Sequence, residues 1–202
     1  MGKSLKRDLM REQLAHHAAK LIAEDGIADF ASAKRKAARQ LGASDTQHLP
    51  SNREVEEALH RYRALYQHES HPNILHHLRT EALACMQQFS AFHPYLTGSV
   101  LNGTAGEHSD INLTLYSDDA KAVLLFMLNN KLTFEDSVWR TRLSGRDEAV
   151  PSYTLSSESS TQIHIIVLPE NARHSGSRHP DTHADIAAVN KMIEDTGARI
   201  ED

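Results

Sequence analysis

The sequence predicts an α+β protein in which a helical N-terminal module, residues 1–92, precedes a small α/β domain, residues 93–202, with a mixed β-sheet and flanking helices. Two observations lead to this prediction. Apolar residues recur at helical spacing in the first part and at strand spacing in the second. Residues 1–93 hold 13 Lys and Arg against 11 Asp and Glu, whereas residues 94–202 hold 9 against 16, so the charge changes sign near the same point.

Four helices are expected in the first module. Gly26 ends the first helix, and Asp29 is placed to cap the second. Ser51 followed by Glu54 is a capping-box pattern at the start of the third. The fourth follows Pro72 and carries one apolar stripe. The expected helical segments are 9–25, 27–42, 51–67 and 73–92.

The second part alternates between polar and apolar residues. Ile111, Leu113 and Leu115 fall on one face of a strand, and Asp110 and Asn112 fall on the other. Serine-rich or charged segments, including 144–149 and 170–183, are expected to be loops. The expected strands are 110–116, 134–143, 150–157 and 161–168, and the expected helices are 118–131 and 182–195.

Composition excludes several classes of protein. A single cysteine, Cys85, rules out an internal disulfide and a multi-cysteine zinc site, and its helical surroundings predict a buried thiol. No apolar run approaches the roughly 20 residues of a membrane span, and the charged N-terminus does not fit a signal peptide. A cytoplasmic protein without a membrane partner is therefore expected. The net charge of −5 does not indicate general nucleic-acid binding.

The segment Leu96–Tyr116, LTGSVLNGTAGEHSDINLTLY, contains the main candidate site. The pair Gly98-Ser99 allows backbone N–H groups to approach an anion closely. Polar side chains at i and i+2 of a strand, here Asp110 and Asn112, lie on one face and can hold a hard cation. A glycine-serine turn followed by such a strand suits phosphoryl transfer.

This segment resembles the nucleotidyltransferases of the polymerase-beta type, whose hallmark is Gly-Ser, about ten residues, Asp-x-Asp, and a third acid on a later strand. Gly98-Ser99, ten residues and Asp110-Ile111-Asn112 follow that pattern. The resemblance covers roughly residues 80–170, and the helical first half looks like an extension found in an uncharacterised bacterial subgroup. It implies a nucleoside triphosphate as partner and Mg²⁺ or Mn²⁺ as cofactor.

Two departures from the family pattern weaken the metal site. Asn112 stands where the family has its second acid, and His164 stands at the expected third position. Asp110, Asn112 and His164 would then be both the catalytic set and the metal ligands, although Mg²⁺ prefers charged oxygen ligands. The alternative is structural: Asp110 closes a turn, while Asn112 and His164 are ordinary polar residues on an exposed sheet face.

Cationic residues elsewhere have two interpretations each. Arg140 and Arg142 either reach a triphosphate or protect an edge strand from aggregation. Lys34, Arg35, Lys36 and Arg39 either contact RNA or another polyanion or form a solvated helix face.

Histidines are frequent and several are clustered. Those at 179 and 183, with Asp185, have metal-ligand spacing, but Pro180 opposes a continuous helix through them, so solvated surface histidines are favoured.

Two functions from different classes fit these features. One is an enzyme that transfers a nucleoside monophosphate to an unidentified acceptor, with Gly98 and Ser99 holding the phosphates. The other is a catalytically depleted nucleotide- or RNA-binding regulatory module of the same fold. Replacement of two of the three expected acids favours the second, because it lowers the affinity for metal.

Overall fold

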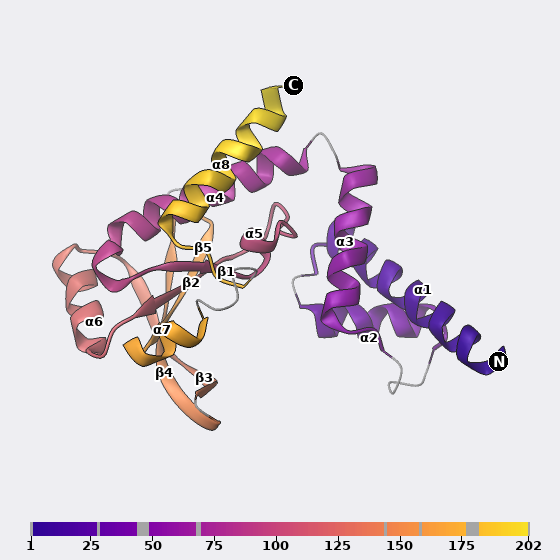
Figure 1. Cartoon of the computed structure of the whole chain (residues 1–202), viewed down its shortest axis with the longest axis horizontal. Coiled ribbons are helices and arrows are strands. Elements are labelled where there is room, and N and C mark those ends of the chain that lie inside the picture. Colours follow the sequence, from indigo (N-terminus) through magenta and orange to yellow (C-terminus); the bar gives the residue numbers. More distant parts are fainter. Residues whose placement is uncertain are drawn as a thin grey trace. The chain divides into compact units, whose positions relative to one another are not determined.

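The computed structural model in Figure 1 confirms the predicted α+β architecture, with helices preceding a mixed β-sheet that has flanking helices. It describes residues 2–27, 29–43, 49–67, 70–143, 145–157, 159–176 and 182–201. The chain divides into two compact units, Met1–His71 and Pro72–Asp202. In the described ranges, no helix combines the length and the apolar character that a membrane-spanning segment requires.

The boundary between the units lies earlier than the 92/93 boundary that the sequence indicated. The reason is helix α4, His71–Gln88, whose apolar side chains are buried in the core of the second unit. Those side chains include Leu75, Leu78, Ala82, Cys85 and Met86. Periodicity identifies a helix but not the surface that covers it, so the sequence pattern assigns α4 to the wrong unit.

The described residues of the first unit form three helices: α1 (Gly2–Asp25), α2 (Phe30–Gln40) and α3 (Asn52–Tyr66). Its helix starts follow the predicted caps. The Asp29 side chain accepts hydrogen bonds from the backbone N–H groups of Ala31 and Ser32, and Ser51 and Glu54 form the complete capping box. Alanines such as Ala18 and Ala37 are fully buried between the helices, which allows the backbones to approach closely.

The second unit is built on a five-stranded sheet of order β1-β2-β5-β4-β3. The central strands β2 and β5 are parallel, and every other neighbouring pair is antiparallel. The strands are β1 (Tyr95–Thr97), β2 (Ile111–Tyr116), β3 (Phe134–Leu143), β4 (Arg146–Ser156) and β5 (Gln162–Leu168). The remaining helices are α5 (Gly98–Asn102), α6 (Ala120–Asn129), α7 (Glu170–Gly176) and α8 (Ile186–Glu201).

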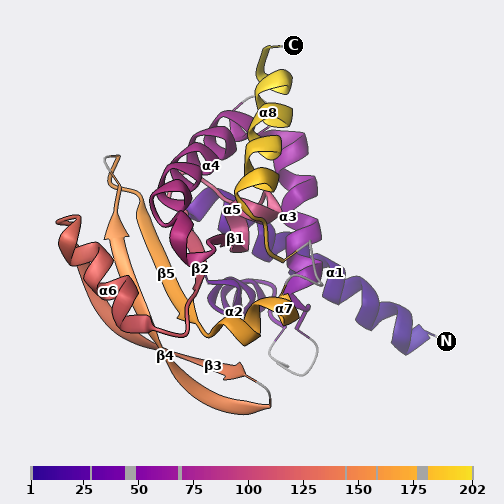
Figure 2. The same ribbon diagram turned by 60° about the vertical axis from the view of Figure 1, so that its left-hand side comes forward.

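The two faces of the sheet differ in chemistry. Ile111, Leu113 and Ile165 point into a core that also contains side chains of α4, α6 and α8. Figure 2 shows α4 and α8 side by side, and Arg79 Nη1 on α4 donates a 3.0 Å hydrogen bond to Thr196 Oγ1 on α8. The opposite face carries partly exposed polar side chains in its central strands, and the candidate site lies there.

The bounds of several elements differ from the sequence prediction, including α1, which begins at Gly2 rather than residue 9, and α8, which ends at Glu201 rather than residue 195. Strand β4 begins at Arg146 rather than Val150, because the tight turn at Gly145, with φ +83°, pairs Arg146 with Leu143. Residues 170–176, expected to be loop, form α7. Its first N–H group, that of Glu170, donates a 3.0 Å hydrogen bond to Asp118 Oδ1, a capping partner 52 residues away in the sequence.

Candidate functional site

A row of polar side chains crosses the more polar face of the sheet. Strand register aligns Thr97 on β1, Asn112 on β2, His164 on β5 and Thr154 on β4. Paired residues on neighbouring strands point to the same face, so these four side chains share it. Asp110 directly precedes β2 on that side. The structure therefore brings Asp110, Asn112 and His164 together, although their roles remain predictions.

Both ring nitrogens of His164 have partners. Nε2 lies 3.4 Å from Asp110 Oδ2, and Nδ1 lies 3.0 Å from Thr154 Oγ1. In the tautomer that directs Nε2–H toward the carboxylate, Nδ1 accepts a hydrogen bond from the Thr154 hydroxyl. Asp110 and His164 are each about half exposed, so the pair lies at the surface of the sheet.

Gly98 occupies a position that a side chain would obstruct. Its φ is +74°, a left-handed conformation that favours glycine, and an added Cβ would lie 3.2 Å from Asn112 Nδ2. The neighbouring Thr97 hydroxyl donates a 3.2 Å hydrogen bond to the backbone carbonyl of Asn112. Backbone N–H groups of Thr104 and Ala105 donate to the carbonyl of Ser99, which anchors the loop that leads to Asp110. The phosphate-binding role of Gly98 and Ser99 remains a prediction.

The donor set fits magnesium poorly. Asp110 supplies one carboxylate, Asn112 a neutral amide oxygen and His164 an imidazole, whereas Mg²⁺ takes oxygen ligands and favours carboxylates. Within the described ranges, no three His, Cys, Asp or Glu side chains are grouped so that they could hold a metal ion. Mg²⁺ or Mn²⁺ binding therefore gains no support from the residues present.

Arg140 and Arg142 lie away from the row that contains Asn112 and His164. They pair with Ala149 and Asp147 near the tip of the β3–β4 hairpin, whereas the row crosses β4 at Thr154. Five residues along a strand correspond to about 17 Å. The structure does not bring these arginines to the site, and their exposed edge-strand position fits the alternative interpretation, protection against aggregation.

Sequence reasoning missed a different cation, Arg173 on α7. It donates a hydrogen bond to the Tyr95 side chain, which raises the pKa of Arg173 above its usual value. Tyr95 pairs with Thr114, so it lies on the polar face, two residues along β1 from Thr97. The spacing of Glu170 and Arg173, which lie 3.8 Å apart, was the available helical signal after Pro169.

The basic cluster on α2 is largely occupied by contacts within its own unit. Lys34 Nζ donates to Asn52 Oδ1 at 2.8 Å, and Lys36 Nζ lies 2.7 Å from Asp25 Oδ2. Arg35 donates to the Ser32 hydroxyl at 3.1 Å. Contact of Lys34, Arg35, Lys36 and Arg39 with a polyanion remains a prediction, and it would compete with these bonds.

The late histidine cluster is only partly described. His179 lies outside the described residues. His183 Nδ1 is 2.9 Å from Thr182 Oγ1, and Asp185 accepts a 2.8 Å hydrogen bond from the Ala188 N–H at the start of α8. The Asp185 carboxylate therefore has a helix-capping role.

Comparisons with known proteins find structures that are similar to about half of this chain. No protein-family model and no curated protein matches the chain. Solved structures similar to part of it include a cytoplasmic RNA terminal U-transferase (23% identity, TM-score 0.31), Cid1 with RNA terminal uridylyl transferase activity (21%, 0.30) and a GLD-2/RNP-8 complex (19%, 0.30). In the same order, the matched regions cover 48%, 45% and 52% of this chain. This chain spans only 29%, 28% and 43% of the length of those structures. The fold described above rests on the topology of the chain itself.

Proposed function

We propose that the second unit is a nucleotide-binding module that keeps the frame of a nucleotidyltransferase site without its two-metal chemistry. The observation that carries this proposal is the 3.4 Å contact between His164 Nε2 and Asp110 Oδ2. An imidazole occupies the strand position where a metal-binding carboxylate is expected, and it contacts the remaining acid. The Asp110 carboxylate then has a protein partner rather than a shell of acids around a cation.

Three features of the site support nucleotide binding. Gly98 brings the glycine-serine turn against the Asn112 side chain, where a Cβ would crowd Asn112 Nδ2, and the backbone N–H groups of such a turn suit a phosphate. Arg173, on the polar face, provides a guanidinium group that suits phosphate oxygens. The Thr154 hydroxyl, which can accept as well as donate, and the Asn112 side-chain amide offer hydrogen-bonding groups to a ribose or a base. Together they hold a nucleoside triphosphate by hydrogen bonds and one cation instead of by magnesium.

The test combines binding with turnover. Thermal unfolding of the full chain is measured with each of the four ribonucleoside triphosphates in the presence of EDTA, and pyrophosphate release is measured with Mg²⁺ or Mn²⁺. The proposal predicts a rise in the unfolding temperature with at least one nucleotide and no pyrophosphate release. Absence of any thermal shift overturns nucleotide binding, and metal-dependent pyrophosphate release overturns the loss of chemistry.

Nucleotidyl transfer to an unidentified acceptor is the second candidate. The observation that favours it is the half-exposed Asp110 carboxylate, which lies beside Asn112 on the same face as in the two-acid pattern. The pyrophosphate assay decides between the two candidates, because only the enzyme releases pyrophosphate from the triphosphate.

A further inference from the structure

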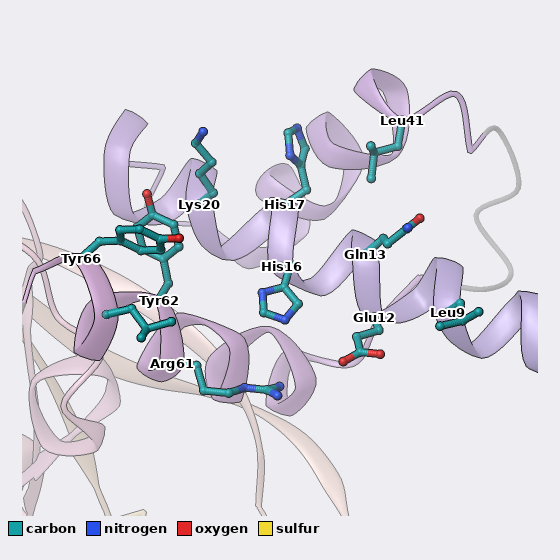
Figure 3. A pocket seen from close by; sticks show the side chains of 11 residues that line it. Leu9, Glu12, Gln13, His16, His17, Lys20, Leu41, Arg61, Tyr62 and Tyr66 are labelled. Carbon is teal, nitrogen blue, oxygen red and sulfur yellow. The ribbon is translucent and has the colours of Figure 1, made fainter.

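A shallow groove of about 640 Å³ lies on the first unit, along the exposed side of α1. Its lining comes from α1, from the second half of α3 and from Leu41 after α2. Figure 3 shows Leu9, Gln13, His16 and Lys20 following one another along α1, with Tyr62 and Tyr66 beyond Lys20. The groove belongs entirely to the first unit, so it is separate from the row around Asn112 and His164.

The two ends of the groove are apolar. Leu9 is 53% exposed and Leu41 39% exposed at one end, and Leu65 is 70% and Tyr66 71% exposed at the other. Exposed apolar side chains gathered around a groove are typical of a protein-binding surface.

The aromatic end of the groove is held in place before any partner binds. The Tyr62 and Tyr66 rings are 4.7 Å apart between centroids and inclined at 39°. The Tyr62 hydroxyl donates a hydrogen bond to the Glu24 carboxylate, which raises the pKa of Tyr62 to about 12. A preorganised aromatic pair loses little conformational entropy on binding, which is why such residues are frequent binding hot spots.

The middle of the groove carries the cations Lys20 and Arg61 and the imidazoles of His16 and His17. Glu12 is the one carboxylate among its described lining residues. Lys20 lies 3.7 Å from Glu24, whereas Arg61 Nε donates to a neutral partner, the carbonyl of Glu57. A partner that matches this pattern carries acidic side chains between two apolar groups.

We propose that this groove, lined by α1, α3 and Leu41, binds an acidic amphipathic helix of a partner protein. Leu9 and Lys20 are eleven residues apart on α1, which corresponds to about 16 Å or three helical turns, and Tyr66 lies beyond Lys20 (Figure 3). A helix laid along α1 therefore presents two apolar clusters at least about three turns apart, with Asp or Glu between them. Leucines at both ends favour this occupant over a polynucleotide, because leucine side chains provide no stacking surface for bases.

Display selection on the full chain tests the proposal with a library of helical peptides. The expected enriched peptides are acidic and have apolar clusters at least about three turns apart. Their dissociation constants are then measured against two variants. Leu65→Glu places a charge in the apolar end and is expected to weaken binding by at least about tenfold. Leu125→Glu changes a leucine of the second unit that is 56% exposed outside the groove, and it is expected to leave binding unchanged.

Several results would overturn the proposal. One is that selection on the wild-type chain enriches no peptides beyond those that selection on the Leu65→Glu variant enriches. Another is that the enriched peptides are basic. Equal loss of binding in both variants, with circular dichroism spectra that match the wild type, removes the groove from the interaction. Light scattering that finds a wild-type dimer and a Leu65→Glu monomer assigns the groove to a second copy of the chain. Oligouridylate binding that Leu65→Glu abolishes assigns it to nucleic acid.

Discussion

The Nε2 atom of His164 lies 3.4 Å from the Oδ2 atom of Asp110, across the parallel strands β2 and β5. The sequence pattern of the polymerase-beta-type nucleotidyltransferases leads us to expect a carboxylate where this imidazole stands. Asn112, which pairs with His164 and lies on the same face, stands at the other position where an acid is expected. The chemistry of the site therefore depends on three positions that can be altered one by one.

Restored carboxylates should create a metal site. In Asn112→Asp/His164→Asp, three carboxylates converge and repel one another, so we expect a lower unfolding temperature without metal than in the wild type. Mg²⁺ or Mn²⁺ should reverse this loss, because a cation at about 100 times its dissociation constant stabilises the folded state by about 2.7 kcal/mol. Thermal unfolding with and without metal measures both effects.

A matched control adds the same charge elsewhere. Ser137→Asp/Thr141→Asp places two carboxylates on β3, away from the row that contains Asn112 and His164. We expect no metal-dependent stabilisation of that variant. A site variant that gains no more stability from metal than this control would show that the three positions do not form one site.

Gly98→Ala should weaken nucleotide binding as well as folding. The positive φ costs roughly 1–2 kcal/mol for a residue with a side chain, and the new Cβ must displace Asn112 Nδ2 from 3.2 Å. Gly145→Ala is the control, because its φ of +83° is similar and nothing lies within 4 Å of its added Cβ. Urea unfolding and nucleotide titration are measured on both variants. Unchanged affinity in a folded Gly98→Ala protein would remove Gly98 from the phosphate site.

The capping box should make the first unit sensitive to acid. Hydrogen bonds from the Ser51 side chain and backbone lower the pKa of Glu54 to about 2 in the folded state, from a usual value of 4.5. A lowered pKa means that the stabilisation is complete above pH 4.5 and is lost as the pH falls toward 2. Ser51→Ala should cost about 1 kcal/mol near neutral pH and flatten this dependence. Helical circular dichroism between pH 6 and 2 measures it, and identical pH profiles for variant and wild type would contradict it.

The Cys85 thiol should be nearly unreactive in the folded protein. Burial raises the pKa of Cys85 to about 12 and leaves the side chain 8% exposed, so little thiolate is present near neutral pH. Reaction with a disulfide reagent is expected to be slow in buffer and fast in denaturant. Rapid modification without denaturant would show that α4 leaves its place in the core.

Local patterns were sufficient for most of the elements and for the face that Asp110 and Asn112 share. The alternation in residues 134–143 predicted β3 with its observed bounds, and the period-two pattern around Asp110 and Asn112 predicted the face that they share. The pair Gly98-Ser99 was expected to form a turn with an accessible backbone, and Gly98 has a φ of +74°, a conformation that favours glycine. Each of these features depends on neighbours close in the sequence.

Features set by distant contacts were not predictable in the same way. The start of α7 depends on Asp118, so Arg173 was hidden in a segment that reads as loop. The position of Arg140 depends on how far the β3–β4 hairpin extends past β5, which follows from strand register rather than from composition. The unit boundary depends on the core that covers α4.

Calorimetric titration of the wild-type chain with the nucleotide that gives the largest thermal shift tests the central claim most directly. It is performed once in EDTA and once with Mg²⁺. Because His164 stands where an acidic ligand is expected and contacts Asp110, we predict binding in EDTA with an affinity that Mg²⁺ leaves nearly unchanged. Binding that occurs only with Mg²⁺ would contradict the account and would show that Asp110, Asn112 and His164 still hold a metal.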